Sequence, residues 1–206
     1  MKSLLLSVSL IASLLLFGCG GGNGSVSSPT ATTQASPTPS VAANSADAAE
    51  PAPEDEKGLS DDFAGTADVT EKKSDIDGAA LLTAVRTGQQ ENFDRMVFQF
   101  GGARLPGYHI EYIDKPVRSC GSGEVVPLAG DAWLEIRFYP ANAHTEDGKG
   151  TIPVRSMAPG HRIVKELKST CDFEADVSWV AGVSSANKYR ILELTNPTRL
   201  VVDVKH

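Results

Sequence analysis

The feature that most constrains the fold is an alternation of apolar and polar residues with a period of two in the C-terminal part of the chain. In YHIEYI, the residues Tyr108, Ile110 and Tyr112 fall on one side, and His109 and Glu111 fall on the other. The same pattern recurs in FDRMVFQF (93–100), AWLEIRFY (132–139) and RLVVDV (199–204). A period of two is typical of β-strands with one buried face. These segments are therefore predicted to be half-buried strands.

Breaker residues separate these segments at short intervals. Gly101-Gly102, Pro106-Gly107 and the TEDGKG stretch (145–150) are typical of turns. DVSWVAGV (176–183) and YRILELT (189–195) add two more expected strands, while HRIVKELKST (161–170) fits either a strand or a short helix. About seven short strands without β-α-β spacing predict an all-β fold, an antiparallel β-sandwich. We place this domain at residues 79–206, a length sufficient for one core.

The N-terminal residues predict an export signal. Lys2 precedes the run Leu4–Phe17, which is apolar apart from three serines. Its 14 residues are fewer than the roughly 20 that a membrane-spanning helix needs, but they fit the apolar region of a secretory signal. The following LFGC resembles the lipobox of bacterial lipoproteins, which implies a signal peptide over residues 1–18 and lipid attachment at Cys19. The alternative is an unlipidated secretory signal.

A segment of low hydrophobicity follows, rich in Gly, Ser, Thr, Pro and Ala. Positions 20 to 78 hold 3 Lys and 11 Asp or Glu, hence a net charge of −8, whereas positions 79 to 206 hold 15 basic and 15 acidic residues. Such a composition predicts disorder. We therefore interpret residues 19–78 as a lipidated, disordered acidic linker, with a root-mean-square reach of roughly 40–45 Å. Residues 60–80 fit either a solvated spacer or a short transient helix.

Two cysteines, Cys120 and Cys171, lie within the predicted domain. An exported protein meets an oxidising compartment, in which such a pair normally forms a disulfide. The alternative is two unpaired thiols. Their spacing differs from that of CxxC redox and zinc motifs.

Several segments together resemble one family. FDRMVFQFGG, PGYHIEYIDKPV, AWLEIRFYPANAHT and the terminal PTRLVVDVKH occur in this order and resemble AMIN-like domains of secreted bacterial lipoproteins. The resemblance spans about residues 83–206. It implies a β-sandwich related to AMIN domains, which target cell-wall enzymes and secretion components to peptidoglycan or the septum.

Residue patterns that would support catalysis are absent from the sequence. There is no G-x-S-x-G elbow, Walker A loop or zincin helix, and the four histidines have no close ligand spacing. We therefore expect no enzyme activity, no cofactor and no metal site. The balanced charge of residues 79–206 gives no nucleic-acid footprint.

Candidate ligand-binding residues come from the polar faces of the strands. Arginine can hold a carboxylate in a bidentate fork, and sugars stack on aromatic rings. The candidates are Arg95, Arg137, Arg199, Asp94, Asp203, Tyr139 and Trp133. The alternative for each Arg–Asp pair is a structural ion pair with a neighbouring strand.

The sequence thus predicts a lipid-anchored cell-envelope protein whose domain binds peptidoglycan or another cell-wall polymer without catalysis. The alternative is an adaptor that recruits an envelope protein through a sheet edge. The expected location is the outer face of the cytoplasmic membrane. In a cell with two membranes, Gly20 after the lipidated cysteine favours the outer membrane.

Overall fold

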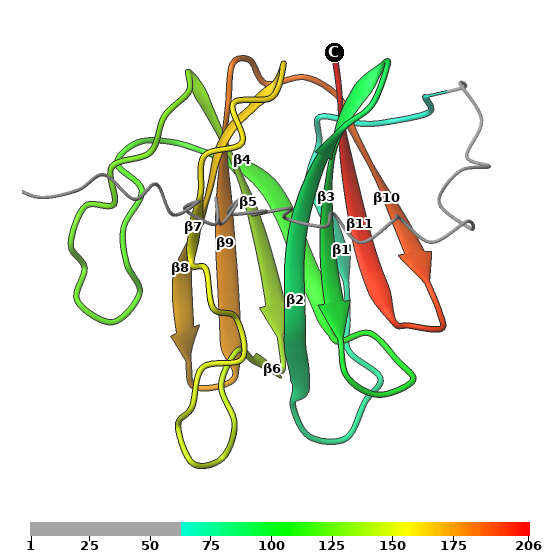
Figure 1. Cartoon of the computed structure of the whole chain (residues 1–206), viewed down its shortest axis with the longest axis vertical. Coiled ribbons are helices and arrows are strands. Elements are labelled where there is room, and N and C mark those ends of the chain that lie inside the picture. Colours follow the sequence, from blue (N-terminus) through cyan, green and yellow to red (C-terminus); the bar gives the residue numbers. More distant parts are fainter. Residues whose placement is uncertain (1–62) are drawn as a thin grey trace, which may run out of the picture. The chain divides into compact units, whose positions relative to one another are not determined.

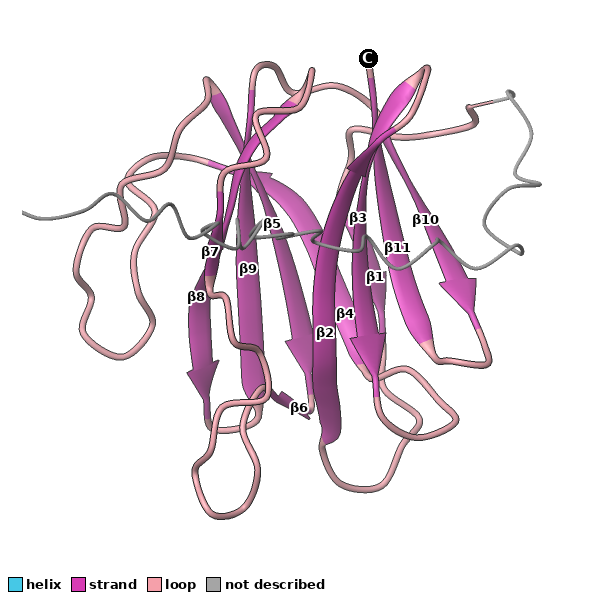
Figure 2. Cartoon of the chain, in the orientation of Figure 1, coloured by secondary structure: helices cyan, strands magenta, loops and turns pink. Residues whose placement is uncertain are grey.

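The alternating segments form strands of two facing β-sheets in the computed structural model, which describes residues 63–206 (Figures 1 and 2). The predicted signal peptide, Cys19 and most of the predicted linker lie outside the described residues. The described part is built from strands, turns and loops, and none of it is a helix that could cross a membrane. This architecture confirms the predicted all-β sandwich.

Eleven strands make up the described part of the chain. They are β1 (Thr70–Lys72), β2 (Ala80–Gln89), β3 (Phe93–Phe100), β4 (Gly107–Ile113), β5 (Ala132–Tyr139), β6 (Ala141–Asn142), β7 (Ser156–Met157), β8 (Val164–Phe173), β9 (Asp176–Val183), β10 (Tyr189–Leu194) and β11 (Arg199–Lys205). One sheet has six strands in the order β1-β4-β5-β9-β8-β7, and the other has five in the order β10-β11-β3-β2-β6. Every neighbouring pair is antiparallel except β2 and β6.

The core lies between the two sheets and uses the apolar faces that the alternation predicts. Phe98 of the five-stranded sheet packs on Phe138 and Trp179 of the six-stranded sheet, with ring centroids 5.1 and 6.3 Å apart. These three side chains are fully buried. Aromatic residues bury large apolar areas and favour tilted or edge-on contacts, so this cluster is a main source of stability.

The sandwich begins earlier in the chain than the sequence suggests. β1 pairs with β4, and Thr66 exchanges two backbone hydrogen bonds with Tyr189 at 2.9 and 2.7 Å. Residues 66–72 thus belong to the fold, although the sequence places them in the linker and allows a transient helix there. The stretch TEK has no apolar alternation, because β1 is held by backbone pairing at a sheet edge rather than by burial of a face.

Tertiary contacts settle the one ambiguous segment of the predicted domain. HRIVKELKST is strand from Val164 onward, because Val164 and Leu167 are fully buried in the core as part of β8. The β8–β9 hairpin closes through Glu174 and Ala175, both with positive φ (51° and 60°). Such angles at two central residues define the turn type that matches strand twist in a tight hairpin.

Residues 114–131, which we term the strap, connect β4 to β5 and cross the outer face of the six-stranded sheet. Val117 packs on Trp133 and Val180 there. Gly182 of β9 lacks a side chain where the strap passes, and a Cβ at this position would collide with the Ala129 carbonyl. The strap therefore needs glycine at 182 to approach the sheet.

Candidate functional site

The outer face of the six-stranded sheet carries rows of polar side chains that cross its strands. The strand register aligns His109 of β4 with Arg137 of β5, Arg137 with Ser178 of β9, and Ser178 with Cys171 of β8. Two residues further along these strands, on the same face, Glu111 of β4 lies opposite Glu135 of β5. Cross-strand neighbours on one face lie about 4.5–5.5 Å apart, so these rows form continuous chemical surfaces.

A groove of about 460 Å³, which we term the β5 groove, opens on this face. Its walls include Tyr108, His109, Glu135, Arg137 and Tyr139. Tyr139 is 58% exposed, and its ring is available at the end of β5. The groove thus combines an aromatic surface with charged groups of both signs.

Arg137 is already paired within the protein. Its Nε donates to Asp176 Oδ2 at 2.6 Å, and its Nη2 also contacts that oxygen. This hydrogen bond to Asp176 raises the pKa of Arg137. The guanidinium is half exposed, so it can still contact a ligand along its free edge.

Glu135 has the most unusual environment in the groove. Burial raises the pKa of its carboxyl, and the like charges of Glu111 and Asp176 add to this, while Arg137 and His109 oppose it. His109 lies between two carboxylates, 3.5 Å from Glu71 and 3.2 Å from Glu111. A ligand that donates hydrogen bonds to Glu135 would offset the cost of removing this carboxyl group from water.

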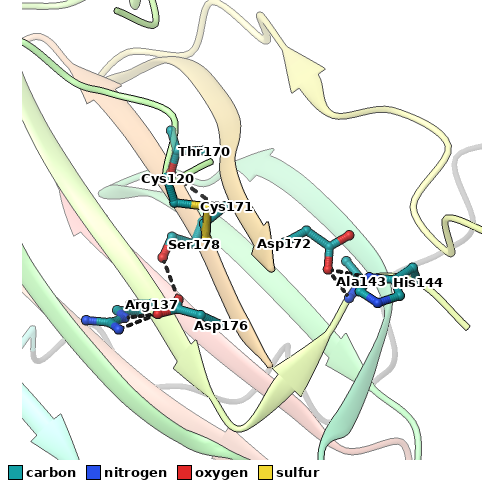
Figure 3. Close-up of a disulfide and its surroundings, with 9 residues drawn as sticks. All are labelled: Cys120, Arg137, Ala143, His144, Thr170, Cys171, Asp172, Asp176 and Ser178. Carbon is teal, nitrogen blue, oxygen red and sulfur yellow. Dashed lines mark hydrogen bonds and ion pairs between the residues drawn. A yellow bond between two sulfur atoms is a disulfide. The ribbon is translucent and has the colours of Figure 1, made fainter. Parts of the chain in front are cut away.

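A second hollow of about 550 Å³, which we term the disulfide hollow, lies around Cys120 and Cys171. Figure 3 shows the disulfide beside Ser178 and Asp176, which connect it to Arg137 of the β5 groove. Ser178 Oγ donates to Asp176 Oδ1 at 3.1 Å. At the end of β8, Phe173 also lines this hollow and is 59% exposed.

Asp172 organises the rim of the disulfide hollow. It accepts hydrogen bonds from Arg155 Nη2 at 2.6 Å and from the Ala143 N–H at 2.9 Å, and His144 Nδ1 lies 2.8 Å from it. Burial alone would raise its pKa, but the bonds from Arg155, Ala143 and His144 bring it below the ordinary value. Arg155 is therefore committed to an internal partner, as Arg137 is.

The predicted cysteine pair is confirmed. Cys120 and Cys171 form a disulfide with Cα atoms 5.2 Å apart, and the Cys120 N–H donates to the Thr170 carbonyl at 3.1 Å. The bond fastens the strap to β8. Closing a loop of this length stabilises a domain by about 4 kcal/mol in chain-entropy terms.

The other predicted arginines lie elsewhere. Arg95 of β3 forms a bidentate pair with Asp203 of β11, at 2.7 and 2.9 Å, and Arg190 also binds Asp203 at 2.9 Å. Arg95 is 5% exposed, and Asp203 and Arg199 are fully buried. Arg95 and Asp203 thus match the alternative of a cross-strand structural pair, whereas Arg199 Nε donates to the Pro197 carbonyl at 3.1 Å. Burial of β3 and β11 on both faces is the physical reason.

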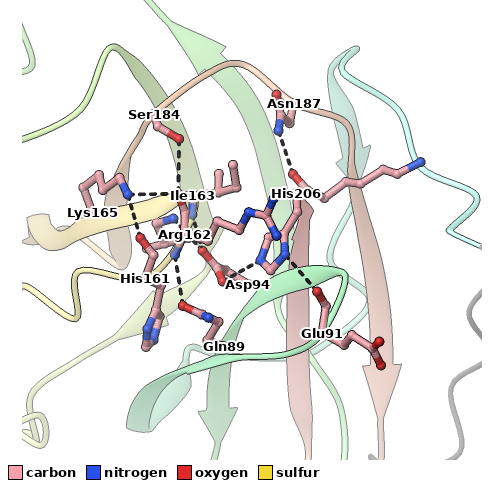
Figure 4. A network of polar contacts seen from close by, with 12 residues as sticks. Gln89, Glu91, Asp94, His161, Arg162, Ile163, Lys165, Ser184, Asn187 and His206 are labelled. Carbon is pink, nitrogen blue, oxygen red and sulfur yellow. Dashed lines mark hydrogen bonds and ion pairs between the residues drawn. The ribbon is translucent and has the colours of Figure 1, made fainter.

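Asp94 also has a structural environment. Its carboxylate accepts hydrogen bonds from the N–H groups of Ile163 and Val164 at 2.5 and 2.9 Å, and His206 Nε2 lies 2.9 Å from it (Figure 4). Burial would raise its pKa, but these hydrogen bonds lower it. Asp94 thus ties β3 to the start of β8 and to the end of the described chain at His206.

Trp133 is not open to a sugar ring. It is 9% exposed, packs on Val117 and Val180, and has Lys115 Nζ 3.8 Å from its ring centroid. Of the seven residues predicted to bind a ligand, only Arg137 and Tyr139 come together in the β5 groove. Residues 63–206 contain no group of three His, Cys, Asp or Glu side chains that could hold a metal ion.

Sequence reasoning missed several residues of this face, among them His109, Glu135 and Phe173. The alternation in YHIEYI and AWLEIRFY does place His109 and Glu135 opposite the apolar row. It does not say which strands are neighbours, and only the register brings these residues beside Arg137. Phe173 gave no signal, because a single aromatic residue before a turn is normally part of a core.

One family model matches the chain, that of the AMIN-like domain, over residues 80–206. The match covers more than half of the chain. The protein belongs to the AMIN-like family. No curated protein and no solved structure matches the chain. AMIN-like domains are generally non-catalytic binding domains associated with the bacterial cell envelope, so the outer-face groove is a candidate binding surface.

Proposed function

We propose that this protein is a lipid-anchored cell-envelope protein whose AMIN-like domain binds peptidoglycan or another cell-wall polymer. The single observation that carries the proposal is the β5 groove, in which the exposed Tyr139 ring adjoins Arg137 and the half-buried Glu135. Ligand sites commonly combine apolar or aromatic walls with a few polar groups. Family membership supports a binding role in the envelope.

Cys19 is the proposed point of lipid attachment, after removal of residues 1–18. Each buried methylene contributes about 0.8 kcal/mol to membrane binding, and two or more chains anchor a protein stably. The acidic linker would then carry the domain away from the membrane surface. The anchor places the domain at the outer face of the cytoplasmic membrane, or at the outer membrane if the cell has two.

A sacculus pull-down with the detergent-solubilised full chain tests the wall-binding role. Wild type is expected to sediment with purified sacculi, and Tyr139→Ala is expected to lose most of this binding while its circular dichroism stays unchanged. A folded wild-type protein that stays in the supernatant at low salt would contradict the proposal. Val154→Ala, an exposed loop position, is the matched control.

An adaptor role is the second candidate, and the open edge of β10 favours it. Thr66 forms a single bridge with this edge, at Tyr189, and a hollow of about 510 Å³ continues along it past Ile191 and Glu193. Backbone groups alternate in direction along a strand, so the N–H of Ile191 points to the same side as that of Tyr189. An extended peptide could add a strand there.

The variant Ile191→Pro separates the two roles, because proline is tolerated on edge strands but removes the outward donor. The adaptor role predicts loss of a co-purifying protein and unchanged sacculus binding. The wall-binding role predicts that sacculus binding depends on Tyr139 and not on Ile191.

A further inference from the structure

Two of the most exposed aromatic side chains lie on one row of the outer face. Phe138 pairs with Val177, which places the next residue, Tyr139, opposite Asp176, and Phe173 pairs with Asp176 from the other side. Tyr139, Asp176 and Phe173 therefore follow one another across β5, β9 and β8. Because neighbouring strands are about 4.8 Å apart, the backbones of Tyr139 and Phe173 are separated by about 9.6 Å.

This row joins the two hollows of the outer face. Tyr139 lines the β5 groove, and Phe173 lines the disulfide hollow. The polar chain Arg137–Asp176–Ser178 connects them (Figure 3). The surface is thus a strip that crosses the strands, with an aromatic ring at each end and hydrogen-bonding groups between.

The charges of the strip favour an uncharged ligand over an anionic one. Arg137 is neutralised by Asp176, and Arg155, at the rim of the disulfide hollow, is neutralised by Asp172. Glu135 in the β5 groove offers carboxyl oxygens as hydrogen-bond acceptors, and burial raises the pKa of this carboxyl. Hydroxyl and amide N–H groups of a ligand would donate hydrogen bonds to Glu135. A ligand carboxylate would instead meet arginines that already form ion pairs with aspartates.

We propose that this strip binds a glycan strand that runs across β5, β9 and β8, with sugar rings stacked on Tyr139 and Phe173. Two aromatic surfaces separated by two strand spacings match a polymer of rigid, repeating sugar units better than a flexible peptide. The inference rests on the proposed wall-binding function and deepens it, because it names the sugar strand, rather than the peptide stem, as the recognised part.

The test measures binding of soluble N-acetylglucosamine oligomers of two and six units to the detergent-solubilised full chain by titration calorimetry. The six-unit oligomer is expected to bind more tightly, since it can reach both rings. Tyr139→Ala and Phe173→Ala are each expected to weaken binding of the six-unit oligomer by about tenfold, the scale of an aromatic anchor. Tyr139→Phe keeps the ring and is expected to bind as wild type, as is the control Val154→Ala.

Binding that is unchanged in both alanine variants would overturn the proposal, as would equal affinity for the two oligomers. Sacculus binding distinguishes a failure of the sugar-strand proposal from a failure of the wall-binding function. If sacculi are bound but the oligomers are not, and removal of the peptide stems from the sacculi abolishes binding, the wall-binding function stands and the sugar inference fails. If neither sacculi nor oligomers are bound by folded protein, both fail.

Discussion

Arg95 and Arg137 stand in similar sequence patterns, each opposite the apolar row of a strand, yet they end in different surroundings. Arg95 is 5% exposed and forms a bidentate pair with Asp203, which also binds Arg190. The Arg137 side chain is 52% exposed and pairs with Asp176 at the edge of a groove. An Arg–Asp pair is thus structural where both partners are withdrawn from water, and available for recognition where one is still solvated.

The largest expected effect comes from breaking the buried pair. Arg95→Ala leaves the Asp203 carboxylate buried without its bidentate partner, so the free energy of unfolding should fall by about 3–5 kcal/mol. Urea denaturation followed by circular dichroism measures this. A loss below about 1 kcal/mol, the scale of an exposed pair, would show that the β3–β11 face is more solvated than the contacts indicate.

Reduction of the disulfide should have a smaller effect, about 2–4 kcal/mol, since it releases a loop between residues 51 apart in sequence. The double variant Cys120→Ser/Cys171→Ser should have a melting temperature several degrees lower than the oxidised protein. Reductant added to this double variant is the control and should change nothing. An unchanged melting temperature of the reduced wild type would mean that the strap's other contacts hold it in place.

Acid should weaken the protein through Asp94 and Asp172, whose pKa values are lowered in the fold. Each contributes stability that is present above the ordinary aspartate pKa of 3.8 and is lost as the pH falls through the lower folded value. Asp94→Asn should lower the unfolding free energy at pH 7 by about 1.5–3 kcal/mol and should make the acid limb shallower. Thermal melts between about pH 2 and pH 7 span this window and provide the measurement. Parallel acid limbs in variant and wild type would refute the prediction.

The smallest expected effect on stability is that of Arg137→Ala. A half-exposed ion pair contributes about 0.2–1 kcal/mol, so the unfolding free energy should change by less than about 1 kcal/mol. Sacculus binding should nevertheless fall, because Arg137 lines the β5 groove. A loss of stability as large as that of Arg95→Ala would show that the Arg137–Asp176 pair is structural, as the Arg95–Asp203 pair is.

The sequence alone was enough to predict the sandwich and the disulfide. Alternation with a period of two is a local property, since successive side chains of any strand point to opposite faces, and it identified Met96, Phe98 and Phe100 as the core-facing side of β3. It could not reveal β1, whose three residues depend on the edge of β4. It also gave no sign of β2, because the ALLTAVRTGQ segment has no regular alternation and is held between β3 and β6 by backbone pairing.

The tertiary structure alone decided which polar residues form a surface. Sequence places Arg95, Arg137 and Arg199 on the polar sides of their strands, but whether that side is covered depends on what packs over the strand. Likewise, Tyr139 and Phe173 are 34 positions apart in the chain, and only the register of β5, β9 and β8 sets them on one row. Local chirality and side-chain type determine which face of a strand each residue occupies. Long-range pairing determines which strands lie beside one another, and no short stretch of sequence encodes it.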